Sequence, residues 1–374
     1  MPKLLITASE YPPFVGGIST LINTFINELK HYPALDIHLF APAGSLSPIH
    51  CHLHEQYDRH QGTLSLYRTC RNNALKLAKL HHQHQFDAIC FMDASARMYH
   101  FSAVPNVQSL VYVHGTEVIV TSRLGELVSH RVALQRTALQ RATYIAVNSK
   151  STGRLVQRLL PQCHPKVIYP CYDPCRAYDS RKHYPNPYPS EPHTVKFLTV
   201  SRLIKSKGHK TVLKLLAILR PKLPPFQYYI AGDGPARAHL VSLAHRLNLS
   251  NQVVFLGALP GEQLPAFYRY ADLFIMLPSH QKRTESFGLV FIEAGLAELV
   301  AVGSDYGGIP EAIQTGETGL LINLSNLEMA AAQILELLQD AMRREKLGKA
   351  SRERALTEFS PKKFTQQILK VLDL

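Results

Sequence analysis

The sequence predicts an α/β protein with two doubly wound domains, each built on a parallel β-sheet. Short apolar runs alternate with helical patterns along the first half of the chain, and the same alternation restarts in the second half. A polar stretch rich in Pro and Tyr, residues 171–194, separates the two halves. The length of 374 residues also exceeds what one hydrophobic core usually serves.

In the first half, residues 3–7 predict a buried strand, and further strands are expected in DIHLFAP, FDAICFMD, LVYVHGTE and TYIAVNS. A helix is expected after Gly16 and Gly17, capped by Ser19 or Thr20. The apolar side of this helix is formed by Leu21, Ile22, Phe25 and Leu29.

The second half predicts strands in VKFLTVSRL, FQYYIAGDGP, QVVFLGAL and ADLFIMLPS. We therefore expect an N-terminal domain over residues 1–172, a connector over 173–194, a C-terminal domain over 195–358 and an amphipathic helix over 359–374. Ligands of open α/β sheets bind beyond the carboxyl ends of the strands. Two such domains predict a ligand cleft between them.

The composition favours a folded protein of the cytoplasm. Apolar residues make up 46% of the chain and charged residues 18%, which is typical of a packed core. There is no apolar run of about 18 residues that would span a membrane, and the start MPKLLITASEYPPF does not resemble a secretory signal. The 6 scattered cysteines favour a reducing compartment.

The net charge of +13 is compatible with an anionic membrane surface or a phosphate-bearing ligand. It is spread over both halves, without a dense basic arm or a basic face interleaved with aromatic residues. We therefore do not expect nucleic acid as a partner.

Glycines and cations after the predicted strands suit a phosphate group. Gly16 and Gly17 let the backbone approach an anion, although an ordinary tight turn explains them equally well. They do not form the GxGxxG fingerprint, which argues against hydride chemistry. Arg202 and Lys207 in SRLIKSKGHK can converge on one phosphate, whereas Lys205 is expected to be solvated.

One turn and two carboxylates complete the pattern in the second half. AGDGP, residues 231–235, is a tight turn for which structural and ligand roles are equally open. In RTESFGLVFIEAG, Glu293 lies in an apolar run eight positions after Glu285. Because a buried carboxylate without a partner is costly, either a structural cation or a pair of ligand hydroxyls must meet Glu293. The two glutamates converge only if Glu285 precedes the helix expected over residues 287–296.

The expected helix start adds donors for an anion. Backbone N–H groups of Gly288, Leu289 and Val290 would face a phosphate, helped by the helix dipole. Glu293 would then accept hydrogen bonds from a ribose diol, and Glu285 would meet the group attached to the phosphate. These expectations describe the shape of a nucleotide sugar.

These segments together resemble the retaining GT-B glycosyltransferases of glycosyltransferase family 4, the glycosyl transferases group 1. The resemblance covers nearly the whole chain, and its most specific element is the pair Glu285 and Glu293. It implies two Rossmann-like domains facing a central cleft, with the C-terminal helix crossing back to the first domain. The matching segments are PPFVGGIST, HGTE (114–117), SRLIKSKG, AGDGP, LGAL, ESFGLVFIEA, GGIPE (307–311) and TGLLI (318–322).

The resemblance also implies a role for each candidate site residue. Gly17, with Gly16 beside it, Arg202 and Lys207 hold the donor diphosphate, and Glu293 holds the ribose. The sugar is held by Glu285 and by the backbone of Phe287, Gly288 and Leu289. His114 lies beside the transferred sugar, and the base is contacted near residues 256–259.

The chain departs from the family pattern after the helix that carries Glu293. Glu298 and Val300 stand where the family commonly has Gly and Pro, which affects local geometry more than chemistry. The Lys-Arg-Thr sequence before Glu285 resembles members that use GDP-mannose or a UDP-hexose.

Histidine-rich stretches at 50–60 and 81–85, together with Cys171, Cys175, Cys163 and His164, suggest a metal at first sight. The spacing lacks the paired halves of a zinc site, and the family does not need a catalytic metal. We therefore expect solvated loops and no metal or other cofactor.

These observations predict a retaining hexosyltransferase that uses GDP-mannose or a UDP-sugar. The expected acceptor is a glycan, a lipid-linked sugar or a small molecule in the synthesis of cell-envelope polysaccharide or glycolipid. Two alternatives are a non-catalytic nucleotide-sugar-binding module and a nucleotide-sugar epimerase on the same fold. A non-catalytic module would be expected to have lost at least one charged site residue, but the sequence keeps all four: Arg202, Lys207, Glu285 and Glu293. An epimerase would need further acid/base residues near the diphosphate, and we cannot identify any.

A basic stretch over residues 122–160 predicts where the enzyme works. Arg154 and Arg158 lie one helical turn apart beside apolar residues, Leu155, Leu159 and Leu160. Basic amphipathic faces bind anionic lipid, although a solvated helix face with core leucines is nearly as good an explanation. We expect reversible docking on the inner face of the membrane.

Overall fold

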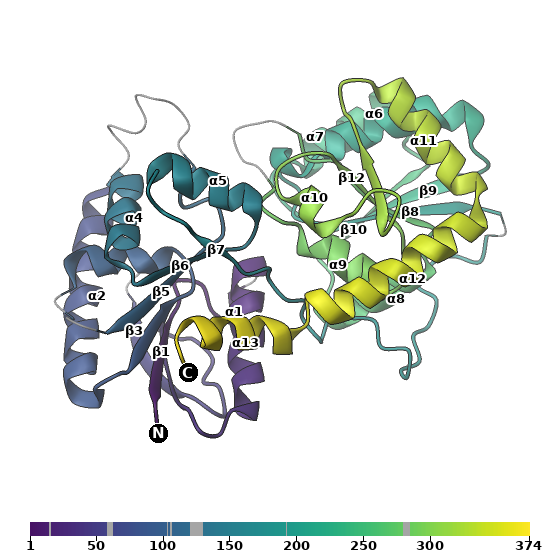
Figure 1. The fold of residues 1–374 in the computed structure, drawn as a ribbon. Coiled ribbons are helices and arrows are strands. Elements are labelled where there is room, and N and C mark those ends of the chain that lie inside the picture. The colour runs from purple at the N-terminus through teal and green to yellow at the C-terminus, as the bar shows by residue number, and fades with distance from the viewer. Residues whose placement is uncertain are drawn as a thin grey trace. The chain divides into compact units, whose positions relative to one another are not determined.

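The computed structural model describes residues 1–14, 16–57, 63–102, 104, 107–119, 130–191, 193–279 and 285–374. The chain forms two compact units, one of Met1–Cys171 with Pro361–Leu374 and one of Tyr172–Ser360 (Figure 1). Each is a Rossmann-like α/β domain on a parallel sheet, which confirms the predicted fold class. The cleft expected between the domains stays a prediction.

The sheet of the first unit has seven parallel strands in the order β3-β2-β1-β4-β5-β6-β7. Because the order reverses between β1 and β4, the position for a ligand lies where these two strands end. The strands are β1 (Lys3–Thr7), β2 (Asp36–Pro42), β3 (His52–Tyr57), β4 (Ala88–Phe91), β5 (Gln108–Val113), β6 (Tyr144–Val147) and β7 (Lys166–Val167).

Helices cover both faces of this sheet. Along β1, Leu4 and Ile6 pack with α1 and α13, whereas Leu5 packs with α2 on the opposite face, as the two-residue repeat of a strand requires. The helical segments of the unit are α1 (Gly17–Glu28), η1 (Leu29–His31), α2 (Thr63–His84), η2 (Ala94–Phe101), α4 (His130–Arg141), α5 (Lys150–Leu159) and α13 (Pro361–Val371).

The predicted cap of α1 is wrong, although its apolar side is buried as expected. The helix begins at Gly17, directly after Gly16, so that Ser19 and Thr20 already belong to its first turn. The Ser19 hydroxyl donates to the carbonyl of Phe14 at 2.8 Å, and the Thr20 N–H donates to that of Gly16 at 2.9 Å. The first helical turn is therefore tied to the preceding loop by Ser19 rather than capped by it.

The histidine-rich stretches are not solvated loops. His52 and His54 lie in β3, and His81, His82 and His84 lie in the last turn of α2. Strand β3 was not predicted because its sequence, HLHEQY, is polar at most positions. It forms the edge of the sheet, where one side of the strand is free of β-neighbours. Residues 58–60 lie outside the described residues.

The second sheet has six parallel strands in the order β10-β9-β8-β11-β12-β13. Its order reverses between β8 and β11, in the same arrangement as the first sheet. The short strands β12 and β13 were not predicted as strands. The six strands are β8 (Val195–Val200), β9 (Phe226–Ala231), β10 (Val253–Gly257), β11 (Leu273–Met276), β12 (Ala301–Ser304) and β13 (Gly319–Ile322).

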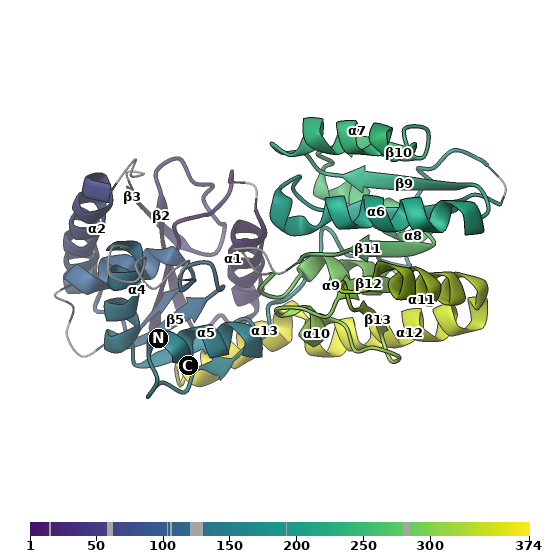
Figure 2. The same ribbon diagram turned by 90° about the horizontal axis from the view of Figure 1, so that it is seen from above.

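Figure 1 shows α6, α7 and α11 on one side of this sheet and α8 and α9 on the other, and Figure 2 looks down on the first group. No helix in the described parts of the chain is long and apolar enough to cross a bilayer. The helical segments are η3 (Lys205–Lys207), α6 (His209–Leu219), η4 (Arg220–Lys222), α7 (Arg237–Arg246), η5 (Gly261–Gln263), α8 (Leu264–Tyr270), α9 (Leu289–Leu296), α10 (Ile309–Ala312), α11 (Leu327–Gln339) and α12 (Ala341–Glu358).

Two segments connect the units in sequence, and each packs within one of them. The C-terminal helix α13 returns to the first unit, where Phe364 meets Phe25 and Tyr112 edge-on, both at 5.6 Å between ring centroids (Figure 1). The polar segment 173–194 belongs to the second unit. There the buried Tyr188 donates its hydroxyl to the carbonyl of Phe267 at 2.7 Å. This segment is therefore a packed part of the domain rather than a free linker.

Candidate active site

The loop after β8 carries Arg202 and Lys207 at the point where the second sheet reverses its order. Arg202 is exposed and Lys207 is partly buried. Gly208 has a left-handed φ of 79°, and a Cβ there would lie 1.8 Å from the carbonyl oxygen of Leu277, just after β11. Only glycine permits this contact, so Gly208 holds the Lys207 loop against the end of β11.

The AGDGP turn supports the same loop. A Cβ on Gly232 would lie 2.0 Å from the carbonyl oxygen of Ser201, and one on Gly234 would lie 2.6 Å from that of Leu203. The Leu203 N–H donates to the carbonyl of Asp233 at 2.9 Å. Of the two roles that the sequence left open, this geometry supports the structural one.

Lys207 and Glu285, 78 positions apart, form an ion pair. Nζ of Lys207 lies 2.5 Å from Oε2 of Glu285. The backbone of Glu285 is held by the GGIPE turn, because the Gly308 N–H donates to its carbonyl at 3.0 Å. A Cβ on Gly308 would lie 1.9 Å from the carbonyl oxygen of Ser286. Arg202 forms no ion pair within the described residues, so the site keeps one exposed cation beside a neutralised pair.

Helix α9 begins at Leu289, two residues later than predicted. Gly288 precedes it with a left-handed φ of 92°. Phe287 turns its side chain into the core, where its ring meets that of Phe359 at 5.4 Å. A ligand could thus contact the backbone of this segment but not the Phe287 side chain. The backbone offers hydrogen-bond donors, because the N–H groups of a first helical turn have no partner within the helix.

The structure supplies a cation for Glu293. Its carboxylate is 3% exposed, and Oε2 lies 3.1 Å from Nη2 of Arg176 and accepts a 2.8 Å hydrogen bond from the Tyr268 hydroxyl. Arg176 comes from the segment predicted as a connector, and Tyr268 comes from α8. Of the two alternatives for Glu293, the structural cation is therefore present.

Burial and pairing act against each other in this cluster. Burial raises the pKa of the Glu293 carboxyl above its ordinary value, and Arg176 and Tyr268 oppose this effect. Burial is the largest single influence on Arg176 and disfavours its charge, but the combined attraction of Glu293, Tyr268 and Asp173 outweighs it and raises the pKa of the guanidinium. Both charges are out of water. Removal of one partner therefore destabilises the fold far more than the intact pair stabilises it, because the remaining charge stays buried and unpaired.

His209 was not singled out in the sequence, and it lies directly beneath the Arg202 loop. It is buried, and its Nε2 is hydrogen-bonded to the Ser201 hydroxyl at 3.0 Å. Burial, with a smaller contribution from Lys207, lowers the pKa of His209 to about 4. A neutral imidazole thus anchors this loop at physiological pH.

In the first unit, His114 directly follows β5. Its Nε2 donates to the carbonyl of Met92 at 2.8 Å, which places the proton on Nε2 and leaves Nδ1 as an acceptor. Its own carbonyl accepts a bond from the Asn148 side chain at 3.1 Å. The imidazole is buried and held in one orientation.

Asp93 organises the end of the neighbouring strands β1 and β4. Its carboxylate accepts bonds from the Ser9 N–H at 2.7 Å, the Ser9 hydroxyl at 2.8 Å and the Glu10 N–H at 3.1 Å. The same loop leads to Gly17, where a Cβ would meet no atom within 4 Å. Packing within the chain thus does not require glycine at position 17.

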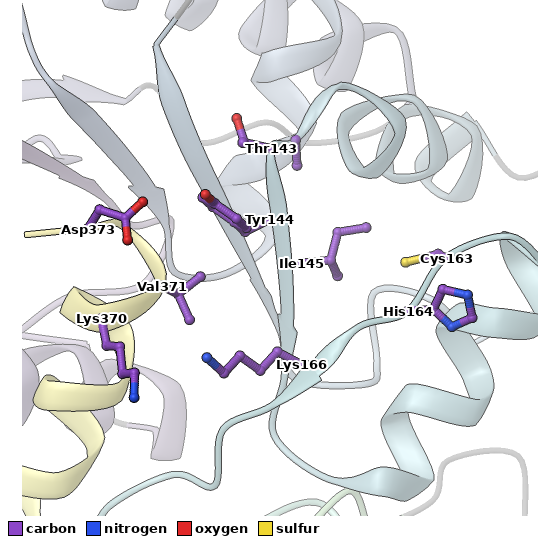
Figure 3. A pocket seen from close by; sticks show the side chains of 10 residues that line it. Thr143, Tyr144, Ile145, Cys163, His164, Lys166, Lys370, Val371 and Asp373 are labelled. Atoms are coloured by element: carbon purple, nitrogen blue, oxygen red, sulfur yellow. The ribbon is translucent and has the colours of Figure 1, made fainter.

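One cavity of the first unit lies away from these residues. It measures about 490 Å³ and lies around the starts of β6 and β7 and the end of α13 (Figure 3). Those strand starts are at the opposite end of the parallel sheet from His114. The residues shown in Figure 3 therefore do not belong to the candidate active site.

Known proteins similar to this chain are glycosyltransferases. The family model of glycosyl transferases group 1 matches residues 180–354. A GDP-mannose-dependent α-(1-6)-phosphatidylinositol monomannoside mannosyltransferase of Mycobacterium tuberculosis is 26% identical over 94% of this chain and 93% of its own. A D-inositol 3-phosphate glycosyltransferase of Corynebacterium diphtheriae is 33% identical over 44% of this chain and 39% of its own.

Solved structures share the whole fold. Sucrose-phosphate synthase of Thermosynechococcus elongatus has a TM-score of 0.81 at 20% identity, covering 100% of this chain and 98% of that one. HepE of Anabaena, crystallised with UDP and glucose, has a TM-score of 0.75 at 19% identity and covers 100% of both chains. The chain is a family 4-like GT-B glycosyltransferase. It is a hexosyltransferase that takes its sugar from a nucleotide sugar.

One of the two departures from the family pattern lies at a strained position. Glu298, which stands where the family commonly has Gly, adopts a left-handed φ of 60°. A side chain in this conformation costs about 1 kcal/mol. The glycosyltransferase therefore carries local strain at the turn after α9.

Some site signals were not visible in the sequence. Arg176, Tyr268 and Asp93 each act through partners at least 80 positions away or on another element. His209 alone had a local signal, because it follows the SRLIKSKG segment directly. The Lys282-Arg283-Thr284 sequence, used above as a hint of the donor, lies outside the described residues.

We predict that Glu293→Ala destabilises the second unit by about 3–5 kcal/mol, because it leaves the Arg176 guanidinium buried and unpaired. Glu293→Gln keeps the shape and the bond from Tyr268, so its loss should be clearly smaller. Glu353→Ala, at an exposed position of α12, is the control and should change little. Denaturant unfolding measures all three, and a loss below 1 kcal/mol for Glu293→Ala would contradict the structural role of this pair.

Proposed function

We propose that this glycosyltransferase moves a hexose from GDP-mannose or a UDP-sugar, with retention of configuration, to a glycan, lipid-linked or small-molecule acceptor. The single observation that carries the proposal is the Lys207–Glu285 pair at the reversal point of the second sheet, with the exposed Arg202 on the same loop. GDP-mannose is favoured among donors because two mannosyltransferases that align over nearly the whole chain, from Mycobacterium tuberculosis and Mycolicibacterium smegmatis, are named for it. Their named acceptor is a lipid, which favours envelope glycolipid or polysaccharide synthesis.

The second unit would hold the donor. Arg202, Lys207 and the backbone of Gly288 and Leu289 would bind the diphosphate, with Gly16 and Gly17 contributing from the first unit. Positive charge and backbone N–H groups fixed in advance stabilise a leaving diphosphate most effectively, because no reorganisation is needed during the reaction.

The two glutamates would have different tasks. Because Arg176 and Tyr268 both bind Oε2 of Glu293, a ribose diol would be held through Oε1. Glu285 would position the sugar, together with the backbone of Phe287. Lys207 occupies the Glu285 carboxylate at 2.5 Å, so Glu285 suits positioning better than proton abstraction. Retention would follow if the leaving phosphate takes the proton of the acceptor hydroxyl on the same face.

His114 remains a catalytic candidate from the first unit. Its proton lies on Nε2, which donates to Met92. Nδ1 could thus accept a hydrogen bond from a sugar hydroxyl.

We predict that Lys207→Ala lowers the affinity for the nucleoside diphosphate at least tenfold, because the site loses a cation and Glu285 loses its partner. Lys205→Ala, on the same loop at an exposed position, is the matched control and should bind normally. Isothermal titration calorimetry with GDP and UDP gives both affinities. Screening nucleotide sugars for turnover, with mass spectrometry of the product, tests the function itself. Normal affinity in Lys207→Ala would refute the site, and no turnover of any nucleotide sugar would refute the function.

We propose that transfer needs no metal ion, because Arg202, Lys207 and the start of α9 supply the positive charge. Turnover should therefore persist in EDTA at a temperature where the protein stays folded. An activity that disappears in EDTA and returns with Mg²⁺ or Mn²⁺, measured with the same donor, would show that the charge comes from a cation instead.

We propose that the enzyme works in the cytoplasm and docks reversibly on anionic lipid of the inner leaflet. Arg154 and Arg158 are exposed on α5, but the apolar residues beside them, Leu155, Leu159 and Leu160, pack against the core of the first unit. Docking would therefore be electrostatic rather than insertive. Arg123 and Glu126 of the same basic stretch lie outside the described residues.

Co-sedimentation with phosphatidylglycerol vesicles should show binding at low salt that high salt abolishes, because exposed charges are screened. Arg154→Glu with Arg158→Glu should weaken it strongly, whereas Arg246→Glu, exposed on α7 of the second unit, should weaken it less. If vesicle binding does not depend on salt, or if no binding occurs at low salt, the docking proposal is wrong. A soluble acceptor would then be the better explanation.

A further inference from the structure

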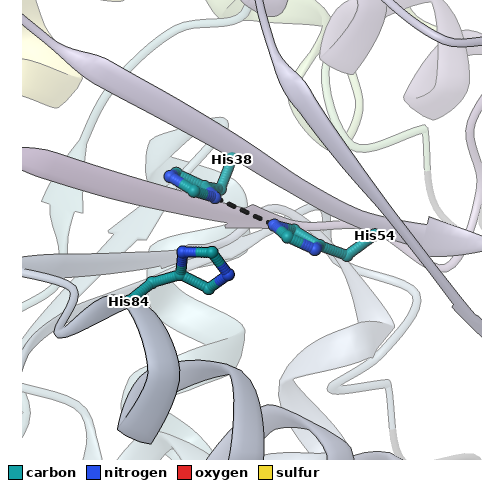
Figure 4. Close-up of side chains that lie close together, drawn as sticks. All are labelled: His38, His54 and His84. Atoms are coloured by element: carbon teal, nitrogen blue, oxygen red, sulfur yellow. Dashed lines mark hydrogen bonds between the residues drawn. The ribbon is translucent and has the colours of Figure 1, made fainter.

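Three histidines from distant parts of the sequence come together in the first unit. His38 lies in β2, His54 in β3, and His84 is the last residue of α2. Figure 4 shows His38 and His54 reaching toward each other from the two strands, with His84 beside them at the end of the helix.

The strand register explains this meeting. His38 is the direct partner of His52, and Phe40 that of His54, so all four lie on one face of the sheet. Phe40 packs with Ala74, Leu77 and Leu80 of α2, which shows that α2 covers this face. The C-terminal turn of α2 thus brings His84 to the two strand histidines.

The geometry is that of a small cluster of nitrogen ligands. One potential ligand nitrogen from each ring lies within 4.8 Å of the other two. Nδ1 of His38 is 2.8 Å from Nε2 of His54, and these two rings are parallel, with centroids 5.2 Å apart. The His84 ring lies 4.8 Å from that of His38 and 5.2 Å from that of His54.

His38 is an unusual residue to bury in this way. It is 3% exposed, and its two ring nitrogens face His54 and Asp36. Burial lowers the pKa of His54 to about 4, with His38, His84 and His52 contributing. Burial also lowers the pKa of His38, although Asp36 acts in the opposite direction. Neutral imidazoles with free lone pairs are the form that binds a metal.

An acidic residue stands behind the cluster. Oδ1 of Asp36 lies 3.2 Å from Nε2 of His38 and 3.3 Å from Nε2 of His52. A carboxylate beside the far nitrogen of a ligand histidine is the usual outer-shell arrangement at metal sites, since it orients the ring and makes it a stronger ligand.

We propose that His38, His54 and His84 bind one divalent transition-metal ion of the kind that prefers imidazole, with Asp36 as the outer-shell partner of His38. Zn²⁺, whose bonds to imidazole nitrogen are about 2.0–2.1 Å, fits three nitrogens this close after small ring movements. Water or another ligand would fill a fourth position. The metal would replace the His38–His54 hydrogen bond.

The role of such a metal would be structural. His38 and His54 lie in the amino-terminal parts of their strands, whereas His114 and Asp93 follow the carboxyl ends of β5 and β4. In a parallel sheet these are opposite ends. The metal would clasp the end of α2 to β2 and to the edge strand β3, and it would not take part in sugar transfer. This proposal does not depend on the proposed function.

The test is Zn²⁺ binding to the full chain without an affinity tag, by calorimetry and by elemental analysis after gel filtration. We expect one Zn²⁺ per chain and a rise of the melting temperature with Zn²⁺. His54→Gln and His84→Gln should each lower the affinity at least tenfold and remove the thermal effect. His82→Gln, exposed on the same helical turn, is the matched control and should behave as the wild type.

Far-UV circular dichroism without metal shows whether each variant is folded. If His54→Gln does not fold, the test uses His84→Gln, whose substitution lies at a helix end. EDTA should lower the melting temperature of the wild type but not of His84→Gln. A wild-type chain that retains no stoichiometric Zn²⁺, or a loss in His82→Gln as large as that in His84→Gln, would overturn the proposal.

Discussion

The second unit depends on the buried contact of Glu293 with Arg176 and Tyr268. This contact joins three elements that are distant in sequence: the segment 173–194, helix α8 and helix α9. A desolvated carboxylate needs both partners. The contact therefore fixes the positions of these three elements relative to one another. Helix α9 follows directly on the segment that carries Glu285, so the same contact also restricts where the site carboxylate can lie.

Close backbone approaches at glycines build the rest of the donor half. Gly208, Gly232 and Gly308 each bring a loop so near to another main chain that a Cβ would overlap it. These contacts join the loop after β9 to the loop after β8, and the loops after β8 and β12 to the segment after β11. Arg202 and Lys207 consequently project from a rigid base, which is what electrostatic stabilisation of a diphosphate requires.

The first unit separates two kinds of chemistry along its parallel strands. The carboxyl ends carry Asp93, which holds the loop before Gly17, and His114, whose ring is fixed by Met92. The amino-terminal parts of β2 and of the edge strand β3 carry two histidines of the cluster. Because side chains at opposite ends of a strand do not meet, a structural metal and metal-free transfer are compatible in one domain.

The sequence by itself determined the two-domain α/β architecture, since strand and helix patterns are local and repeat in order. It also indicated that Glu285 and Lys207 would serve one ligand site, because both precede an expected helix, but it did not predict their direct ion pair. The polar edge strand β3, the packing of residues 173–194 and the partner of Glu293 were decided only by the tertiary structure. Each of these depends on residues brought together across the sheet or between helices, and no local pattern encodes such pairing. The histidines show the same limit: their spacing in sequence suggests loops, and only the register of β2 with β3 and the end of α2 make them a cluster.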